Sequence, residues 1–151
     1  MTIETTRRLF LGAVGVAAAA RSEEAATEKV TGIGGLFFRA NDPKALAKWY
    51  FDHLGINLVP SSYDGQAWRQ QAGPCAFQPF PEKTKYFGDD TKRWMVNFRV
   101  RNMDKMAAQL RAAGVTVDID QKLYPNGRFA HLHDPEGNPI ELWELQGRDA
   151  H

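Results

Sequence analysis

The pattern of apolar and polar positions repeats once along this chain, at an interval of about sixty residues. Residues 36–40 and 96–100 both have an apolar side chain at every second position, as β-strands with one buried face do. Each run is followed by a segment with apolar side chains at helical spacing, and these segments end at Gly55 and Gly114, respectively. The pattern therefore predicts two copies of one strand–helix unit.

Three shorter strand candidates follow each predicted helix. They cover residues 56–60, 66–71 and 75–80 in the first copy, and residues 115–119, 128–133 and 139–144 in the second. Each copy is thus a βαβββ module, and the fold class is α+β. One such module cannot bury both its sheet and its helix, so the two modules should pair, either within one chain or across two chains.

The segment from Phe129 to Glu144 predicts a β-hairpin with its own turn. Asp134 can open a type I turn, Pro135 presets the next φ, and Gly137 suits a position with positive φ. A loop over residues 134–138 fixes the cross-strand pairs, which are His133 with Pro139, His131 with Glu141, and Phe129 with Trp143.

Alternation then gives the hairpin two different faces. One is apolar and consists of Ala130, Leu132, Ile140 and Leu142. The other holds His131 and Glu141 between aromatic side chains, an unusual set for a surface that only water covers. We therefore expect the ligand site on this second face.

The motif Asp134-Pro135-Glu136-Gly137-Asn138, followed by Ile140-Glu141-Leu142, resembles the closing hairpin of the vicinal-oxygen-chelate superfamily. That superfamily includes glyoxalase I, fosfomycin- and bleomycin-resistance proteins and extradiol dioxygenases. The resemblance covers about residues 30–145. It implies modules over residues 30–80 and 94–145, joined by a linker over 81–93, in one curved mixed sheet with a concave cavity and helices outside. It also implies a homodimer.

Within such a cavity, alternation predicts a set of ligand-contacting side chains besides Glu141 and His131. They are Phe37, Arg39, Trp68, Gln78, Asn97, Arg99 and Trp143. This mixture of aromatic and polar groups suits a small organic molecule that is aromatic or rich in oxygen. Each arginine can clamp an anionic group or pair with a nearby aspartate, and each tryptophan can stack on a ligand or simply pack.

The resemblance also indicates where a metal would bind, at Gly35, Gln78, Met95 and Glu141. Of these, Glu141 fits fully and Gln78 can supply an amide oxygen, whereas glycine has no side chain and a thioether is a poor ligand for hard divalent ions. We therefore expect no cofactor, or a single divalent metal held by Glu141, Gln78 and His131.

The predicted catalytic residues are His131 and Glu141. Without a metal, the carboxylate can orient the imidazole and raise its pKa for general acid–base chemistry, or the two can form an ion pair that only shapes the pocket. The leading hypothesis is a small-molecule-binding protein. The alternatives are a metal-dependent lyase, isomerase or dioxygenase, and a non-catalytic dimerisation module.

Charge and cysteine content exclude several other classes. The formal net charge is +1 and the sequence pI about 7.9, which gives no general attraction to nucleic acid or to anionic membranes. The single cysteine, Cys75, excludes a disulfide within the chain and a cysteine-based metal cluster.

The N-terminal residues 1–28 differ from the rest and predict a signal peptide. Arg7 and Arg8 match the twin-arginine export motif, and an apolar stretch over residues 9–20 follows them. That stretch is too short to span a bilayer. The prediction is an exported, periplasmic domain over residues 29–147; the alternative is a cytoplasmic protein with a frayed N-terminal helix.

Overall fold

The computed structural model describes residues 28–150, so the predicted signal peptide, apart from its last residue, lies outside the described residues. Residues 28–36 belong to a separate unit and contain no helix or strand. Every element below belongs to the unit that begins at Phe37. Between residues 28 and 150, no helix combines the length and the apolar character needed to cross a membrane.

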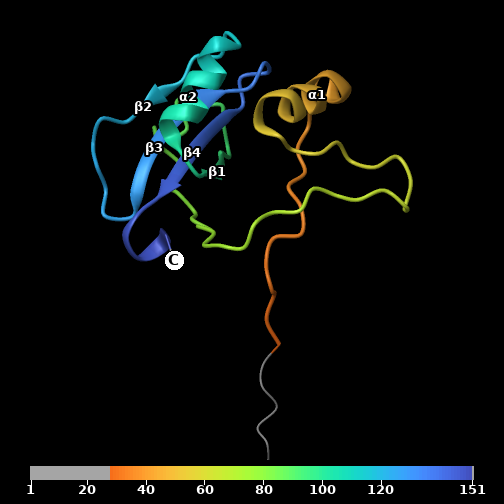
Figure 1. Ribbon diagram of the computed structural model, residues 1–151, viewed down its shortest axis with the longest axis horizontal. Helices are drawn as coiled ribbons and strands as arrows, with labels where there is room; N and C mark the ends of the chain where they lie inside the picture. The colour runs from red at the N-terminus through yellow and green to blue at the C-terminus, as the bar shows by residue number, and fades with distance from the viewer. Residues whose placement is uncertain (1–27, 151) are drawn as a thin grey trace, which may run out of the picture. The chain divides into compact units, whose positions relative to one another are not determined.

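A four-stranded mixed sheet is the centre of this unit (Figure 1). The strand order is β1–β4–β3–β2, with β1 parallel to β4 and the other neighbours antiparallel. The predicted α+β class with a mixed sheet is confirmed. The elements are α1 (Pro43–Leu54), β1 (Val96–Val100), α2 (Met103–Ala112), β2 (Asp118–Ile119), β3 (Gly127–His133), β4 (Pro139–Leu145) and the 3-10 helix η1 (Gly147–Ala150).

The hydrophobic core lies between one face of the sheet and the two helices. The predicted apolar face of the hairpin, Ala130, Leu132, Ile140 and Leu142, is almost fully buried in this core. Helix α2 contributes Met103 and Leu110, both fully buried, and α1 contributes Leu46. Each such side chain stabilises the fold by roughly 1.5–3 kcal/mol relative to exposure.

Helix α1 begins and ends where its sequence predicts. The Asp42 side chain accepts a hydrogen bond from the backbone N–H of Ala45 at 3.0 Å, and Pro43 occupies the first turn, where a missing N–H costs nothing. Gly55 ends the helix with a φ of 69°, a left-handed conformation that glycine adopts without strain.

The β3–β4 hairpin has the predicted register, including the pairs His131 with Glu141 and Phe129 with Trp143. Its turn is closed by the backbone N–H of Gly137, which donates to the carbonyl of Asp134 at 2.9 Å. The Asp134 carboxylate is buried and accepts hydrogen bonds from the backbone N–H groups of Glu136 and Asn138, each at 2.9 Å. The turn motif is therefore held together by its own side chain.

The same turn also contacts helix α1. Tyr50 donates its phenolic hydrogen to Asp134 Oδ2 at 2.9 Å. The two carboxylate oxygens of Glu136 accept the backbone N–H groups of Asn41 and Asp42 at 2.8 and 2.9 Å. These contacts join the start of the first predicted module to the last hairpin of the second.

The first half of the chain differs from the prediction in its strands. Residues 36–40, 56–60, 66–71 and 75–80 are not assigned as strands, and none is assigned anywhere in residues 28–95. Hydrogen bonds to a neighbour maintain a strand, and β1 stands at the edge of the sheet with β4 as its one partner. Alternation predicted an extended conformation here, but it does not supply the partner that makes a strand.

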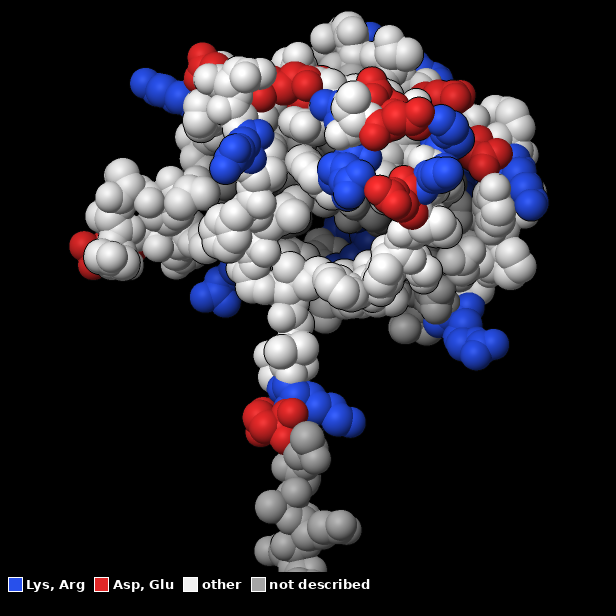
Figure 2. All heavy atoms as spheres, turned by 180° about the vertical axis from the view of Figure 1, so that it is seen from behind, with Lys and Arg blue, Asp and Glu red and all other residues white. Residues whose placement is uncertain are grey.

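Charges of both signs are interspersed on the face shown in Figure 2. This face therefore carries no continuous basic surface of the kind that attracts nucleic acid.

Candidate functional site

A row of four polar side chains crosses the sheet on the face opposite the core. The strand register places Asp118 opposite His131, His131 opposite Glu141, and Glu141 beside Asn97. Directly paired residues of neighbouring strands project from the same face of a sheet. We call these four residues the polar row.

Glu141 is the centre of this row. It is 5% exposed, and its Oε1 accepts a hydrogen bond from Asn97 Nδ2 at 2.7 Å. Its Oε2 accepts one from the Tyr86 hydroxyl at 2.5 Å and lies 3.0 Å from His131 Nε2. Burial alone would raise the pKa of Glu141, but the contacts with His131, Tyr86 and Asn97 outweigh it and hold that pKa below its usual value.

His131 shares this carboxylate without being aligned to it. Its Nε2 is fully buried and has no hydrogen bond of good geometry, although Glu141 Oε2 is close. The contact with Glu141 nevertheless raises the pKa of His131, against the effect of burial, and the negative charges of Asp118 and Asp120 raise it further. The pair therefore favours an ionised imidazolium beside an ionised carboxylate.

Tyr86 covers the row from outside the sheet, and the sequence prediction did not include it. Its ring stacks on Phe80 at 5.1 Å between centroids and meets the His131 ring edge-on at 5.6 Å. Burial, and then the hydrogen bond to Glu141, raise the pKa of its phenol, which stays protonated and donates. The signal in the sequence was Tyr86-Phe87, an aromatic pair within an otherwise polar linker.

A second row next to the first is occupied by internal contacts. Phe129 and Trp143 stack at 5.9 Å between centroids, and the indole N–H of Trp143 donates to the backbone carbonyl of Asn126 at 2.9 Å. Arg99 donates to the backbone carbonyl of Gln71 at 2.6 Å. Trp143 and Arg99 thus lie on the predicted face, but each has a partner within the chain.

The interactions of the remaining predicted ligand-contacting residues do not involve Glu141. Trp68 meets Phe98, a residue of the core-facing row, at 6.3 Å between ring centroids. Phe37 is 93% exposed, and Arg39 is exposed as well. Gln78 is exposed and donates to the neighbouring carbonyl of Pro79 at 3.1 Å.

The structure brings together two of the three predicted metal ligands, His131 and Glu141. No group of three or more His, Cys, Asp or Glu side chains with metal-binding geometry occurs in residues 28–150. Gln78 is hydrogen-bonded to Pro79 instead, so His131 and Glu141 alone supply two of the ligands that such an ion needs. The donor set therefore does not fit a divalent ion as it stands.

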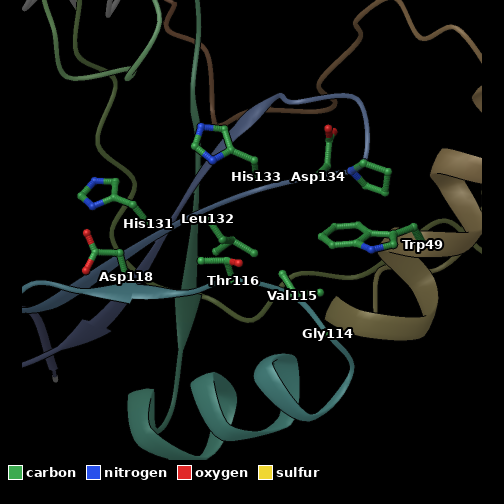
Figure 3. A pocket seen from close by; sticks show the side chains of 10 residues that line it. Trp49, Gly114, Val115, Thr116, Asp118, His131, Leu132, His133 and Asp134 are labelled. Carbon is green, nitrogen blue, oxygen red and sulfur yellow. The ribbon is translucent and has the colours of Figure 1, made fainter.

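Two hollows border the polar row, and His131 lines both. The larger, about 600 Å³, extends from His131 and Asp118 past Leu132 to Trp49 on α1 (Figure 3). The smaller, about 290 Å³, lies under Tyr86. Tyr86 and His131, which contact Glu141, line the smaller hollow. The larger hollow lies at the end of the short strand β2.

A solved structure with a TM-score of 0.50 supports this fold. A glyoxylase/bleomycin resistance protein/dioxygenase domain from Frankia sp. EAN1pec is 17% identical, over 78% of this chain and all of the other (100%), with a TM-score of 0.50. An antibiotic binding protein, TnmS3, from Streptomyces sp. CB03234 is 24% identical over 70% of this chain and 88% of that one, with a TM-score of 0.44.

A shorter match has higher identity. A glyoxalase/bleomycin resistance protein from Streptomyces sp. CB03234 is 37% identical over 36% of this chain and 46% of that one, with a TM-score of 0.31. No curated protein sequence matches the chain.

The family comparison covers most of the domain. The description "Glyoxalase-like domain" matches residues 35–143, which include β1 to β3 and the polar row. The match thus takes in α1, the turn that contacts it and the carboxylate at the centre of the row. The chain belongs to the glyoxalase-like domain family of the vicinal-oxygen-chelate superfamily.

Proposed function

We propose that this protein binds a small organic molecule, aromatic or rich in oxygen, on the sheet face that carries the polar row. The observation that carries this proposal is Glu141, a buried carboxylate on the face opposite the core, whose partners are the movable side chains of Tyr86, Asn97 and His131. Burying a charge is costly unless it is paired, and the packing of the core does not require a charged residue at position 141.

The arrangement suits recognition of an oxygen atom by His131. Its protonated imidazole has an Nε2 that lacks a well-aligned acceptor, and because this atom is fully buried, a ligand oxygen takes that hydrogen only when a neighbouring side chain such as Tyr86 moves aside. Tyr86 and Phe80 supply aromatic surface above the same place. Binding then exchanges a poorly aligned contact for a good one.

A thermal-shift screen with small carboxylates and aromatics tests the proposal. A ligand at one hundred times its Kd should add about 2.7 kcal/mol to the free energy of unfolding. Glu141→Gln should remove that stabilisation. Asp52→Asn, the same change at an exposed site on α1, should keep it. A ligand that stabilises wild type and Glu141→Gln equally would place the site elsewhere.

The second candidate is an enzyme that uses His131 and Glu141 for acid–base chemistry, with or without a divalent metal. The coupled pKa shifts favour it, because the pair is kept ionised and an imidazolium can donate a proton to a bound oxygen. Metal analysis of protein purified without chelators separates the two versions. A stoichiometric ion that is lost in Glu141→Gln would establish the metal-dependent one.

We also propose that the chain forms a homodimer and is exported. The edge of β1 and the exposed Phe37, Val59 and Phe77 give a second copy both a strand to pair with and apolar surface to cover. Light scattering at several concentrations tests the dimer. Replacing Arg7 and Arg8 with lysine, followed by cell fractionation, tests export through the twin-arginine motif.

A further inference from the structure

The smaller hollow beside the polar row has the walls of an aromatic cage. Six residues line it: Tyr86, Asp120, Tyr124, Asn126, Phe129 and His131. The rings of Tyr124 and Phe129 stand nearly perpendicular, at 86° and 5.4 Å between centroids. Tyr86 closes the side nearest Glu141. Three of the six lining residues are thus Tyr or Phe, and the face of such a ring attracts a cation.

A carboxylate stands at the wall of this cage. Asp120 Oδ2 accepts the Tyr124 hydroxyl at 2.8 Å, and Oδ1 accepts the backbone N–H of Lys122 at 2.9 Å. These hydrogen bonds lower the pKa of Asp120, the one from the Lys122 backbone most, so it is ionised at neutral pH. An anion with fixed orientation therefore faces the same space as the rings.

The chain itself already places a cation on one of these rings. Lys122 Nζ lies 4.8 Å from the centroid of Tyr124. Around the hollow, Asp118, Asp120 and Glu141 carry negative charge, whereas Lys122 and protonated His131 carry positive charge. Negative charge remains in excess, and it increases when His131 loses its proton.

The geometry points to a small alkylammonium ion as the ligand of this cage. The ammonium group would contact Tyr86, Tyr124 and Asp120. The hollow of about 290 Å³ equals the volume of about ten water molecules, which limits the ligand to roughly ten non-hydrogen atoms. This inference rests on the proposed binding function and specifies its ligand.

Calorimetric titration of the full chain with two matched probes tests it. Choline has the required shape and charge, and 3,3-dimethylbutan-1-ol has the same shape with a carbon atom in place of the nitrogen. Choline should bind at least about tenfold more tightly, because the neutral probe lacks the attraction to rings and carboxylate. Equal affinities, or no saturable binding of choline, would overturn the inference.

Variants locate the site. Asp120→Asn should weaken choline binding about tenfold and leave 3,3-dimethylbutan-1-ol unaffected, since only the charged interaction changes. Lys122→Met should tighten choline binding, because it removes a positive charge that competes for the Tyr124 ring. A purely structural role of Lys122 would not produce tighter binding. Asp52→Asn on α1 is the control and should change neither affinity. Unchanged choline affinity in Asp120→Asn contradicts the assignment.

The outcomes also separate this inference from the broader proposal. If aromatic or carboxylate probes bind and depend on Glu141 while choline does not bind, the polar row is a binding site and the cage is not its cationic part. If no probe of any class binds, both proposals are wrong.

Discussion

Two buried carboxylates lie on the same hairpin and have different kinds of partner. Asp134 is 4% exposed and Glu141 is 5% exposed. Asp134 accepts from two backbone N–H groups of its own turn, from Asn138 and from Tyr50, so most of its partners are fixed by the fold. Glu141 accepts only from the side chains of Tyr86 and Asn97, and the titratable side chain of His131 lies beside it. A buried charged residue can therefore belong either to the structural scaffold or to the binding site. Whether its partners are mostly backbone groups or side chains distinguishes the two cases.

The largest expected effect comes from removing the scaffold carboxylate. Asp134→Ala should lower the free energy of unfolding by about 3 kcal/mol, because several buried donors lose their charged acceptor at once. Urea denaturation measures this loss. Asp52→Ala on the exposed face of α1 should change stability by less than about 0.5 kcal/mol. A loss below about 1 kcal/mol in Asp134→Ala would mean that water replaces the carboxylate.

The next effect compares two tyrosines that each donate to one of these carboxylates. Tyr50→Phe should cost about 1–2 kcal/mol, since Tyr50 is buried and Asp134 loses a donor that water cannot replace. Tyr86→Phe should cost about 0.5 kcal/mol or less, because Tyr86 is 44% exposed, but it should raise the pKa of Glu141. Denaturation and an NMR titration of the Glu141 carboxyl group measure the two quantities. Equal stability losses would remove the distinction between the two sites.

A smaller effect concerns the contact between the turn and α1. Glu136→Gln should lower the free energy of unfolding by about 0.5–1 kcal/mol, because one neutral amide oxygen replaces a carboxylate that accepts two backbone N–H groups. Hydrogen exchange at the amides of Asn41 and Asp42 should become faster. Unchanged exchange at both amides would show that they do not depend on Glu136.

The smallest effect is the pH dependence that the Glu141–His131 pair contributes. The pKa of His131 is raised by folding, so its stabilising contribution is complete below the ordinary value of 6.5 and is lost as pH rises through the raised value. The pKa of Glu141 is lowered, so its contribution is complete above the ordinary value of 4.5 and is lost as pH falls through the lowered value. Stability from this pair should therefore be greatest between these two pH values.

His131→Gln should flatten the alkaline side of that profile and also weaken the acid side, because His131 is one of the contacts that lower the pKa of Glu141. Denaturation curves between pH 4 and 9 provide the measurement. A slope unaffected by His131→Gln would assign the alkaline transition to another group.

The hairpin was predictable from sequence because its information is local. Asp134, Pro135 and Gly137 fix the turn, and the turn fixes the register that brings His131 opposite Glu141. Helix α1 was predictable for the same reason, since Asp42 and Gly55 mark its ends. Where a few consecutive residues determine the geometry, alternation gave the correct face.

The contacts that sequence reasoning missed are non-local. Tyr86 reaches Glu141 across 55 positions of the chain, and nothing in residues 81–93 indicates that contact except the aromatic pair itself. In the first half of the chain, no neighbouring strand fixes a register, so alternation did not determine which way Trp68 faces. The third proposed metal ligand, Gln78, lies in the same unpaired region.

The hydrogen bond from Asn41 to Glu136 joins residues that are 95 positions apart. At roughly 5–20 residues per second, a ribosome needs about 5 to 20 s to make the intervening chain. During that time the backbone N–H groups of Asn41 and Asp42 lack their acceptor, Glu136, and the phenol of Tyr50 lacks its acceptor, Asp134. The helix can form early from its own caps, but its final position depends on a segment that is synthesised 95 positions later.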